Sequence, residues 1–243
     1  MTDNTDILKY LDLLNPKVKS NVSIVSAEEL GKENMLHISR DGGIKVFTPL
    51  VSNRTANNED RSVPRICVAP DLMGCILGYA ADLVDFDWQP EDNKLWKGGY
   101  YIYAIPYEFA LRPGKKLLYD VEFTDEHWLV GYNPANVKYN ASKIGKVFYH
   151  SVLTIQKDSG LRKRREITMF IEVNGDTPVH FNKEHKLTKG KWKIVAYGLH
   201  NVESHQDTPE RLSVAQISES EYKEAKKLSA DLLSFTEPPS SLW

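Results

Sequence analysis

The chain has 243 residues, of which 41% are hydrophobic and 26% charged, and its formal net charge is −2. This length suits one large domain or two small ones, and the composition is that of an ordinary globular protein. An acidic start without a signal-peptide pattern, no run near the roughly 18 apolar residues that span a bilayer, and only two cysteines lead us to expect a reducing, cytoplasmic location.

The N-terminal segment, residues 1–34, is expected to be helical. Residues 6–14 are predicted to form a short helix, which Asn15 and Pro16 end. Ser26 and Glu29 are spaced as in a capping box, so a second short helix is predicted to begin there.

Two blocks with chemically useful side chains follow. Residues 35–39 form an apolar strand that presents His37 and Ser39, and a turn at residues 41–43 ends it. The polar residues 53–60 are predicted to form a loop. Residues 64–70 then form a buried strand that leads into a helix with Tyr79.

The rest of the chain is predicted to be mainly strands. Runs of aromatic and β-branched residues indicate strands at 100–105, 117–121, 128–132, 146–155, 167–173 and 192–197. Residues 158–160 are typical of a hairpin tip. A capped helix begins at Ser218, with an apolar stripe of Tyr222, Ala225, Leu228 and Leu232.

We therefore predict a β-rich α+β fold, with a mixed or antiparallel sheet, short N-terminal helices and a C-terminal helix. Residues 1–243 are expected to form a single domain. It would comprise the helical segment 1–34, a β-rich core at 35–200, and a linker with the C-terminal helix at 201–243.

The charge is unevenly distributed. Residues 141–199 contain 12 Lys and Arg against 5 Asp and Glu, a balance of +7, which leaves −9 for the remainder. The cations cluster at residues 162–165 and between Lys183 and Lys193. This region could bind an acidic protein or a nucleic acid. Alternatively, its lysines could protect the edges of strands from aggregation.

The two blocks and a third, Thr124–Val130, together resemble the ADP-ribosyltransferase fold, in the His–Tyr–Glu group that includes the poly(ADP-ribose) polymerases. The resemblance covers residues 35–132. His37-Ile38-Ser39 is similar to that group's His-x-Ser/Thr strand, and residues 65–69 with Tyr79 are similar to its second strand and following helix. Asp125-Glu126 before an apolar run resembles the opening of its later acidic strand.

The resemblance implies NAD as substrate and assigns a role to each residue. Glu126 would be catalytic, stabilising positive charge on the ribose and orienting or deprotonating the acceptor. His37 would bind the adenosine-side ribose, Ser39 the nicotinamide amide or ribose, and Tyr79 would stack on the nicotinamide ring. The polymerases have a tyrosine where this chain has Cys67, so Tyr101 or Tyr103 would have to replace that aromatic wall.

Other interpretations of these residues stay open. Asp125 or His127 could be the acting group instead of Glu126, and each site residue could have a structural role. His180 and His185 are five residues apart, but no further ligands surround them, and a loop is the more economical interpretation.

The resemblance predicts an NAD-dependent ADP-ribosyl-type transferase that modifies a macromolecular target, with the basic region 141–199 docking a protein or nucleic acid. The alternative is a non-catalytic binding or inhibitor protein of the phage or mobile-element type that acts by occupying a partner. An NAD-dependent RNA 2′-phosphotransferase is less consistent with the sequence, because that family prefers a basic or histidine residue where this chain has Glu126.

Overall fold

The computed structural model describes residues 11–12, 14–51, 60–79, 95–131, 137–156, 162–201 and 206–230. It divides the chain into two compact units, each built from separated segments. Unit 1 comprises Met1–Ala81, Ile102–Ile144 and Val179–Lys186. Unit 2 comprises Asp82–Tyr101, Gly145–Pro178 and Leu187–Trp243. The prediction of a single domain stays a prediction.

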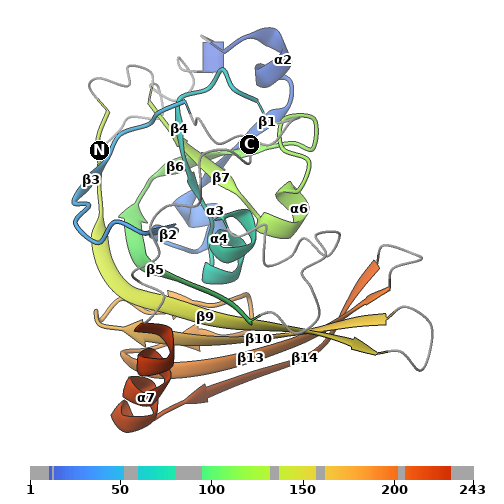
Figure 1. Cartoon of the computed structure of the whole chain (residues 1–243). Coiled ribbons are helices and arrows are strands. Elements are labelled where there is room, and N and C mark those ends of the chain that lie inside the picture. The colour runs from blue at the N-terminus through green and yellow to red at the C-terminus, as the bar shows by residue number, and fades with distance from the viewer. Residues whose placement is uncertain are drawn as a thin grey trace. The chain divides into compact units, whose positions relative to one another are not determined.

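Unit 1 is built around a four-stranded antiparallel sheet of order β1-β6-β7-β4. Its strands are β1 (Val22–Ser26), β6 (Phe109–Pro113), β7 (His127–Val130) and β4 (Arg65–Val68). The helices of this unit are α2 (Pro16–Lys19), α3 (Ala27–Leu30), α4 (Leu72–Tyr79) and α6 (Val121–Thr124), shown in Figure 1. Two small pairs complete it: β3 (Val46–Phe47) with β8 (Tyr139–Asn140), and β11 (Val179–His180) with β12 (Lys186–Leu187).

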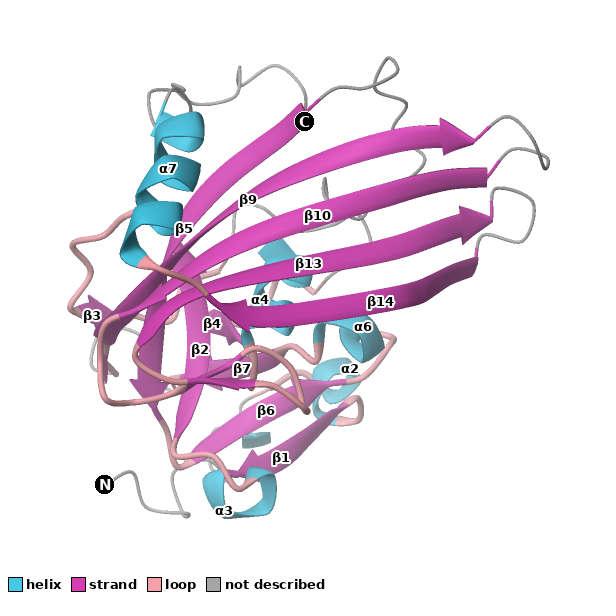
Figure 2. Ribbon diagram, turned by 90° about the horizontal axis from the view of Figure 1, so that it is seen from below, coloured by secondary structure: helices cyan, strands magenta, loops and turns pink. Residues whose placement is uncertain are grey.

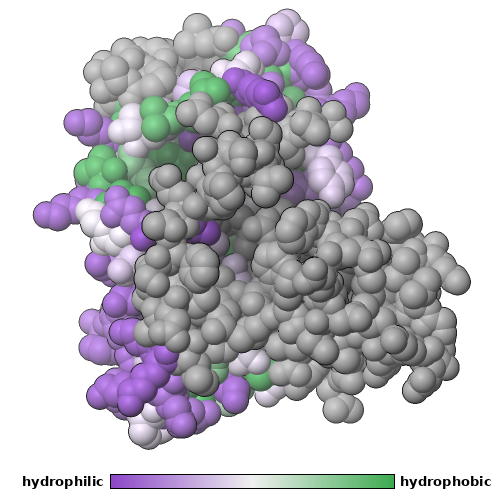
Figure 3. All heavy atoms as spheres, viewed as in Figure 1, coloured by the Kyte–Doolittle hydropathy of each residue, from purple (hydrophilic) through white to green (hydrophobic). Residues whose placement is uncertain are grey.

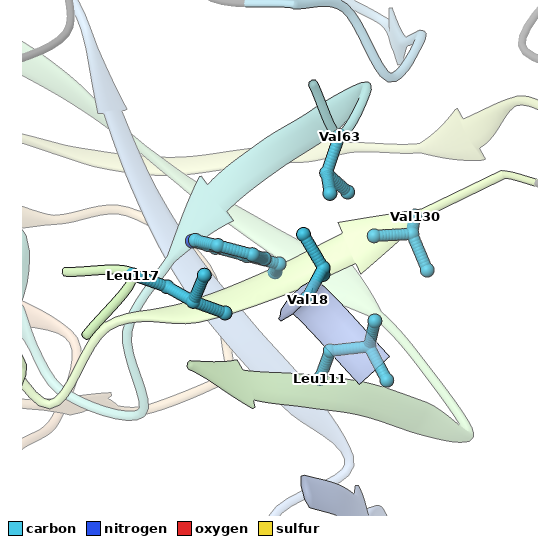
Figure 4. Packing of buried hydrophobic residues seen from close by; sticks show 6 residues of the cluster. Val18, Val63, Leu111, Leu117 and Val130 are labelled. Atoms are coloured by element: carbon cyan, nitrogen blue, oxygen red, sulfur yellow. The ribbon is translucent and has the colours of Figure 1, made fainter. Parts of the chain in front are cut away.

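The residues of β4 and β7 alternate between two apolar clusters, as the two-residue period of a strand requires. Trp128 and Val130 pack in one cluster with Val18, Val63, Leu111 and Leu117 (Figure 4). Leu129, Ile66 and Val68 pack in the other with Met35, Ile105 and Ala110. Both faces of this small sheet are therefore covered, and its strands are fixed in register by the packing.

Long antiparallel strands dominate unit 2. Figure 2 shows β9 (Ser142–Gln156), β10 (Arg162–Val173), β13 (Gly190–Asn201) and β14 (Gln206–Gln216) side by side, with α7 (Glu219–Ala230) near one end. With β5 (Leu95–Pro106) and β2 (Asn34–Ser39) they form a six-stranded sheet of order β14-β13-β10-β9-β5-β2. Tyr222 and Ala225 of α7 pack on Phe170, Phe148 and Ile217.

These elements confirm the predicted α+β class, with antiparallel sheets, few short helices and a C-terminal helix. The capping box is present in both directions, because Ser26 Oγ accepts from Glu29 N and Glu29 accepts from Ser26 N. At α7, Ser218 Oγ accepts from Glu221 N, as a capping residue does. Most of the predicted helix 6–14 and the predicted loop 53–60 lies outside the described residues.

Three element predictions are wrong. Residues 117–121 form no strand, because their amides bond locally, as Leu118 N does to Gly114 O, and the chain enters α6. The segment 1–34 contains strand β1, whose backbone pairs antiparallel with β6 and extends the sheet. The expected linker after residue 200 contains β14, which pairs with β13 although its sequence is polar. No helix among the described residues is long and apolar enough to cross a membrane.

Candidate functional site

His37 in β2 is held on two sides. Its Nδ1 lies 2.8 Å from the carbonyl oxygen of Cys67 in β4, and because a carbonyl only accepts, Nδ1 carries the hydrogen. The ring of Phe47 meets it edge-on with centroids 4.7 Å apart. Burial lowers the pKa of His37 below its usual value, against the opposing effect of the Cys67 carbonyl. The imidazole is therefore neutral at pH 7, with Nε2 as an acceptor.

Tyr103 extends this aromatic contact. Its ring lies edge-on to Phe47 at 5.5 Å, and its hydroxyl donates to the carbonyl of Asp41 at 2.8 Å and accepts from Ile44 N at 3.3 Å. Of the two tyrosines expected to replace the missing aromatic wall, Tyr103 is thus next to the group that contacts His37. It also fixes the turn that follows β2.

Ser39 is the last residue of β2 and has a structural bond of its own. Its Oγ accepts from Asp41 N at 3.2 Å. A hydroxyl in this arrangement keeps its hydrogen for donation, so the bond fixes Ser39 without removing its capacity to bind a ligand carbonyl.

Glu126 immediately precedes β7 and is half-buried. Its Oε1 accepts from the indole Nε1 of Trp128 at 2.8 Å. Its Oε2 lies on the side of α4, where a Cβ built on Gly78 would be 3.7 Å away. Gly78 is exposed and directly precedes Tyr79, the last residue of α4. The carboxylate and the end of the tyrosine helix are therefore neighbours, although the side chain of Tyr79 lies outside what the structure describes.

Cys67 and Arg65 emerge from the same face of β4 beside this carboxylate. Burial raises the pKa of the Cys67 thiol well above its usual value, Glu126 adds to the increase, and Arg65 opposes it. The guanidinium of Arg65 lies 4.3 Å above the Trp128 ring and donates to the carbonyl of Asp60 at 2.8 Å. Glu126 and Arg65 thus act on the thiol with opposite charges, and the thiol is neutral at neutral pH.

The side chains of Asp125 and His127, which flank Glu126 in the chain, both make intramolecular contacts. Asp125 ends α6 with a left-handed backbone (φ 46°), and its Oδ1 is 3.2 Å from Arg112 Nη2. His127 is buried, its Nδ1 donates to the Asp125 carbonyl at 2.8 Å, and burial lowers its pKa. Of the three candidate acting groups, Glu126 is the one whose carboxylate borders an exposed glycine.

Strand β4 brings the three sequence blocks together. Leu36 of β2 and Ala69, which follows β4, exchange backbone hydrogen bonds of 2.8 and 3.0 Å. Residues 65–68 pair with residues 127–130 of β7. The arrangement has one asymmetry: β2, with His37 and Ser39, is a strand of the six-stranded sheet, whereas β7 belongs to the four-stranded sheet.

The basic region 141–199 is divided between the units. Lys183 and Lys186 belong to unit 1, whereas Lys189, Lys191 and Lys193 belong to unit 2 and are each within 4.0 Å of an acidic side chain. Figure 3 shows the described surface around α7 as mostly hydrophilic. Arg162–Arg165 lie in β10 rather than in a turn, and their side chains are outside the described residues. Local pairing therefore reduces the field expected from the lysines of unit 2.

Sequence reasoning missed four residues of this region: Arg65, Phe47, Gly78 and Trp128. The signal for Trp128 was present, since residues i and i+2 of a strand share a face. The contact of Gly78 with Glu126 depends on how α4 folds back after β4, which local patterns do not specify.

Within the described parts of the chain, no three His, Cys, Asp or Glu side chains are grouped to hold a metal ion. Comparisons with protein-family models, with curated proteins and with solved structures found no match for the chain.

Proposed function

We propose that the chain is an NAD-dependent ADP-ribosyl-type transferase that acts on a macromolecular target, with Glu126 as its catalytic residue. One observation supports this function most strongly. Glu126, a half-buried carboxylate at the start of β7, lies beside the end of α4, within the same unit in which His37 of β2 contacts β4. Three short motifs up to about 90 residues apart in the chain are linked through one strand.

The donor set suits NAD as substrate. Neutral His37 offers Nε2 as an acceptor for a ribose hydroxyl, because Nδ1 already donates to Cys67. Ser39 has a hydroxyl hydrogen for the nicotinamide amide or its ribose. Phe47 and Tyr103 add aromatic surface beside His37, and Tyr79 would contribute the ring that stacks on nicotinamide.

The reaction breaks the bond between the nicotinamide nitrogen and C1 of its ribose, and nicotinamide leaves with the bonding electron pair. Positive charge develops on the sugar, and the Glu126 carboxylate stabilises it. An acceptor nucleophile on the target then bonds to C1, and the proton that it loses passes to Glu126. The chain's residues position the sugar, while NAD brings its own leaving group.

The test is nicotinamide release from NAD by the purified full chain. Glu126→Gln retains the shape and removes the charge, so turnover should fall by about a hundredfold or more while NAD still raises the melting temperature. Asp125→Asn is the matched control, and its release should remain within a few-fold of wild type. A larger loss of nicotinamide release in Asp125→Asn than in Glu126→Gln would show that Asp125, and not Glu126, is the catalytic carboxylate.

The non-catalytic binding or inhibitor protein is the second candidate, and one observation favours it. Ser39 ends β2 and Glu126 directly precedes β7, a strand of a different sheet, and each already has an intramolecular hydrogen bond. If millimolar NAD gives neither a thermal shift nor nicotinamide, this candidate replaces the transferase. Docking through residues 141–199 is then tested by a mobility-shift series over salt, because phosphate contacts weaken steeply as salt rises.

A further inference from the structure

The indole of Trp128 is a fixed hydrogen-bond donor aimed at Glu126. Trp128 is fully buried, and its ring is packed between the apolar cluster of Figure 4 and the guanidinium of Arg65, 4.3 Å from the ring centroid. A side chain this enclosed has one rotamer. Its Nε1 lies 2.8 Å from Glu126 Oε1, so the donor cannot move away without disturbing the core.

Glu126 itself needs such an anchor. The terminal torsion of a glutamate is broad, and a half-buried carboxylate can rotate through many orientations. A hydrogen bond from a rigid partner restricts that freedom before a substrate arrives. Preorganised groups of this kind need no reorientation as charge develops in the transition state.

The other side of the carboxylate, at Oε2, lies next to a glycine of α4. Gly78 is exposed, and the nearest atoms to a Cβ placed there are Glu126 Oε2 and Thr124 Cγ2, both at 3.7 Å. Any longer side chain at this position would extend over the carboxylate or into solvent beside it. Gly78 itself therefore places no side chain over the Oε2 side.

We propose that Trp128 is the positioning residue of Glu126, holding Oε1 so that the carboxylate meets its substrate from the side of Gly78. This inference rests on the proposed function for the identity of the reaction. The hydrogen bond itself makes a second prediction, because a donor to the charged form of a carboxylate keeps it ionised to lower pH.

Trp128→Phe tests the role in turnover. The phenyl ring retains most of the packing and removes the N–H. We expect kcat to fall about tenfold with little change in KM, and the acidic limb of the rate profile to move up by about one pH unit. The matched control is Trp192→Phe in unit 2, which removes an indole donor at the same 2.8 Å distance, to the Thr188 carbonyl, and should leave the profile unchanged. An unshifted acidic limb in a folded Trp128→Phe variant overturns the inference.

A second measurement needs neither activity nor a core substitution. In the wild-type chain the Trp128 indole ¹⁵N–¹H resonance should shift with pH as Glu126 titrates, and Glu126→Gln should abolish that shift. The positioning role is overturned if the chemical shift of the Trp128 indole does not change with pH, or if it changes equally in Glu126→Gln. If the wild type releases no nicotinamide, the proposed reaction fails, whereas the resonance still decides whether Trp128 holds Glu126.

Gly78→Leu tests the direction of approach on the helix surface, away from the core. We expect nicotinamide release to fall about tenfold or more, because the new side chain lies over the Oε2 side, while the Trp128 resonance still titrates. Full activity in Gly78→Leu would place the substrate on another side and overturn that part of the inference.

Discussion

The two units are stabilised in different ways. In unit 1 the strands have at most six residues outside β5 and β9, and many polar side chains bond to backbone, as His37, Tyr103 and Arg65 do. In unit 2 the strands run for 11 to 15 residues, and some of the described polar contacts join side chains of the sheet to those of α7. In unit 1, hydrogen bonds from side chains to backbone fix the positions of individual side chains. In unit 2, the long paired strands make an extended and stiff sheet.

The most damaging change should be Gly74→Ala in unit 1. A Cβ at Gly74 would lie 2.2 Å from the carbonyl oxygen of Thr124 and 2.9 Å from Ala69 Cβ. Both are closer than any real contact, so α4 would have to move away from α6. We expect a loss of about 3 kcal/mol in the free energy of unfolding, measured by urea denaturation.

This substitution also tests the separation of the units. Because Thr124 immediately precedes Asp125 and Glu126, hydrogen exchange should accelerate first in α4, β4 and β7 and least in β10 and β13. Uniform acceleration across both units would show that they unfold together and would remove the basis of the comparison.

In unit 2 the largest effect should come from Lys191→Met. Lys191 contacts Glu172 directly, lies 3.8 Å from Glu219 Oε2 and sits 4.6 Å above the Tyr222 ring. The Lys191 and Glu172 side chains are only 18% and 19% exposed, so the substitution leaves a poorly hydrated carboxylate. We expect a loss of about 1–2 kcal/mol, less than for a fully buried pair.

Lys193→Met is the matched control. Its Nζ is 4.0 Å from Glu221 Oε1, and both side chains are more than a third exposed, so the substitution should cost less than about 0.5 kcal/mol.

Burial alone would raise the pKa of Glu172, but the hydrogen bond and charge of Lys191 more than offset it and lower the pKa. The stabilisation by Lys191 should therefore be present above the ordinary glutamate range and disappear as pH falls through the folded pKa.

The sequence was most informative where local rules act alone. The capping box of Ser26 and Glu29 and the apolar face of Tyr222 and Ala225 depend on residues within one or two turns, and both are confirmed. Strand β14 was missed because its residues, Gln206–Gln216, are mostly polar, and pairing with β13 rather than burial makes them a strand. A pattern of hydrophobic residues cannot reveal a strand that is stabilised by backbone pairing rather than by burial.

The candidate site was predictable to a different degree. The order of the three blocks indicated that His37, Tyr79 and Glu126 could be neighbours. The two-residue spacing of Glu126 and Trp128 was a usable signal of a shared face, but it was not used. Nothing local indicated that Cys67 would join His37 through its carbonyl, or that Gly78 would border Glu126. Those contacts depend on sheet register and on the return of α4, which tertiary packing determines.

Lowering the pH should weaken unit 1 through its histidines. Burial lowers the pKa of both His37 and His127 in the folded protein, while the unfolded value is about 6.5. Between the folded and unfolded pKa values the unfolded chain binds more protons, so stability rises with pH. The free energy of unfolding should be at its plateau above about pH 6.5 and fall toward pH 5.5.

His127→Asn separates this effect from general acid destabilisation. The asparagine amide can replace Nδ1 as the donor to the Asp125 carbonyl, and it does not titrate. The slope of unfolding free energy between pH 7 and 5.5 should become shallower in the variant, and hydrogen exchange should place the difference in β7. An unchanged slope would exclude His127 as a source of the pH dependence and leave it to His37 or to other groups.

The smallest expected effect is an increase in stability from Gly78→Ala, four residues after Gly74 on α4. Here a Cβ would lie 3.7 Å from Glu126 Oε2 and from Thr124 Cγ2, which is ordinary van der Waals contact. Alanine also restricts the unfolded chain more than glycine, so the free energy of unfolding should rise by about 0.5 kcal/mol, reduced from the interior-helix value because the position is near the end of α4. Two identical substitutions one turn apart would then have opposite signs, because a methyl group at Gly74 would collide with a backbone carbonyl, whereas one at Gly78 would make ordinary contacts. A loss of stability in Gly78→Ala would mean that α4 and Glu126 are packed more closely than the structure indicates, and the approach to the carboxylate across Gly78 would be lost with it.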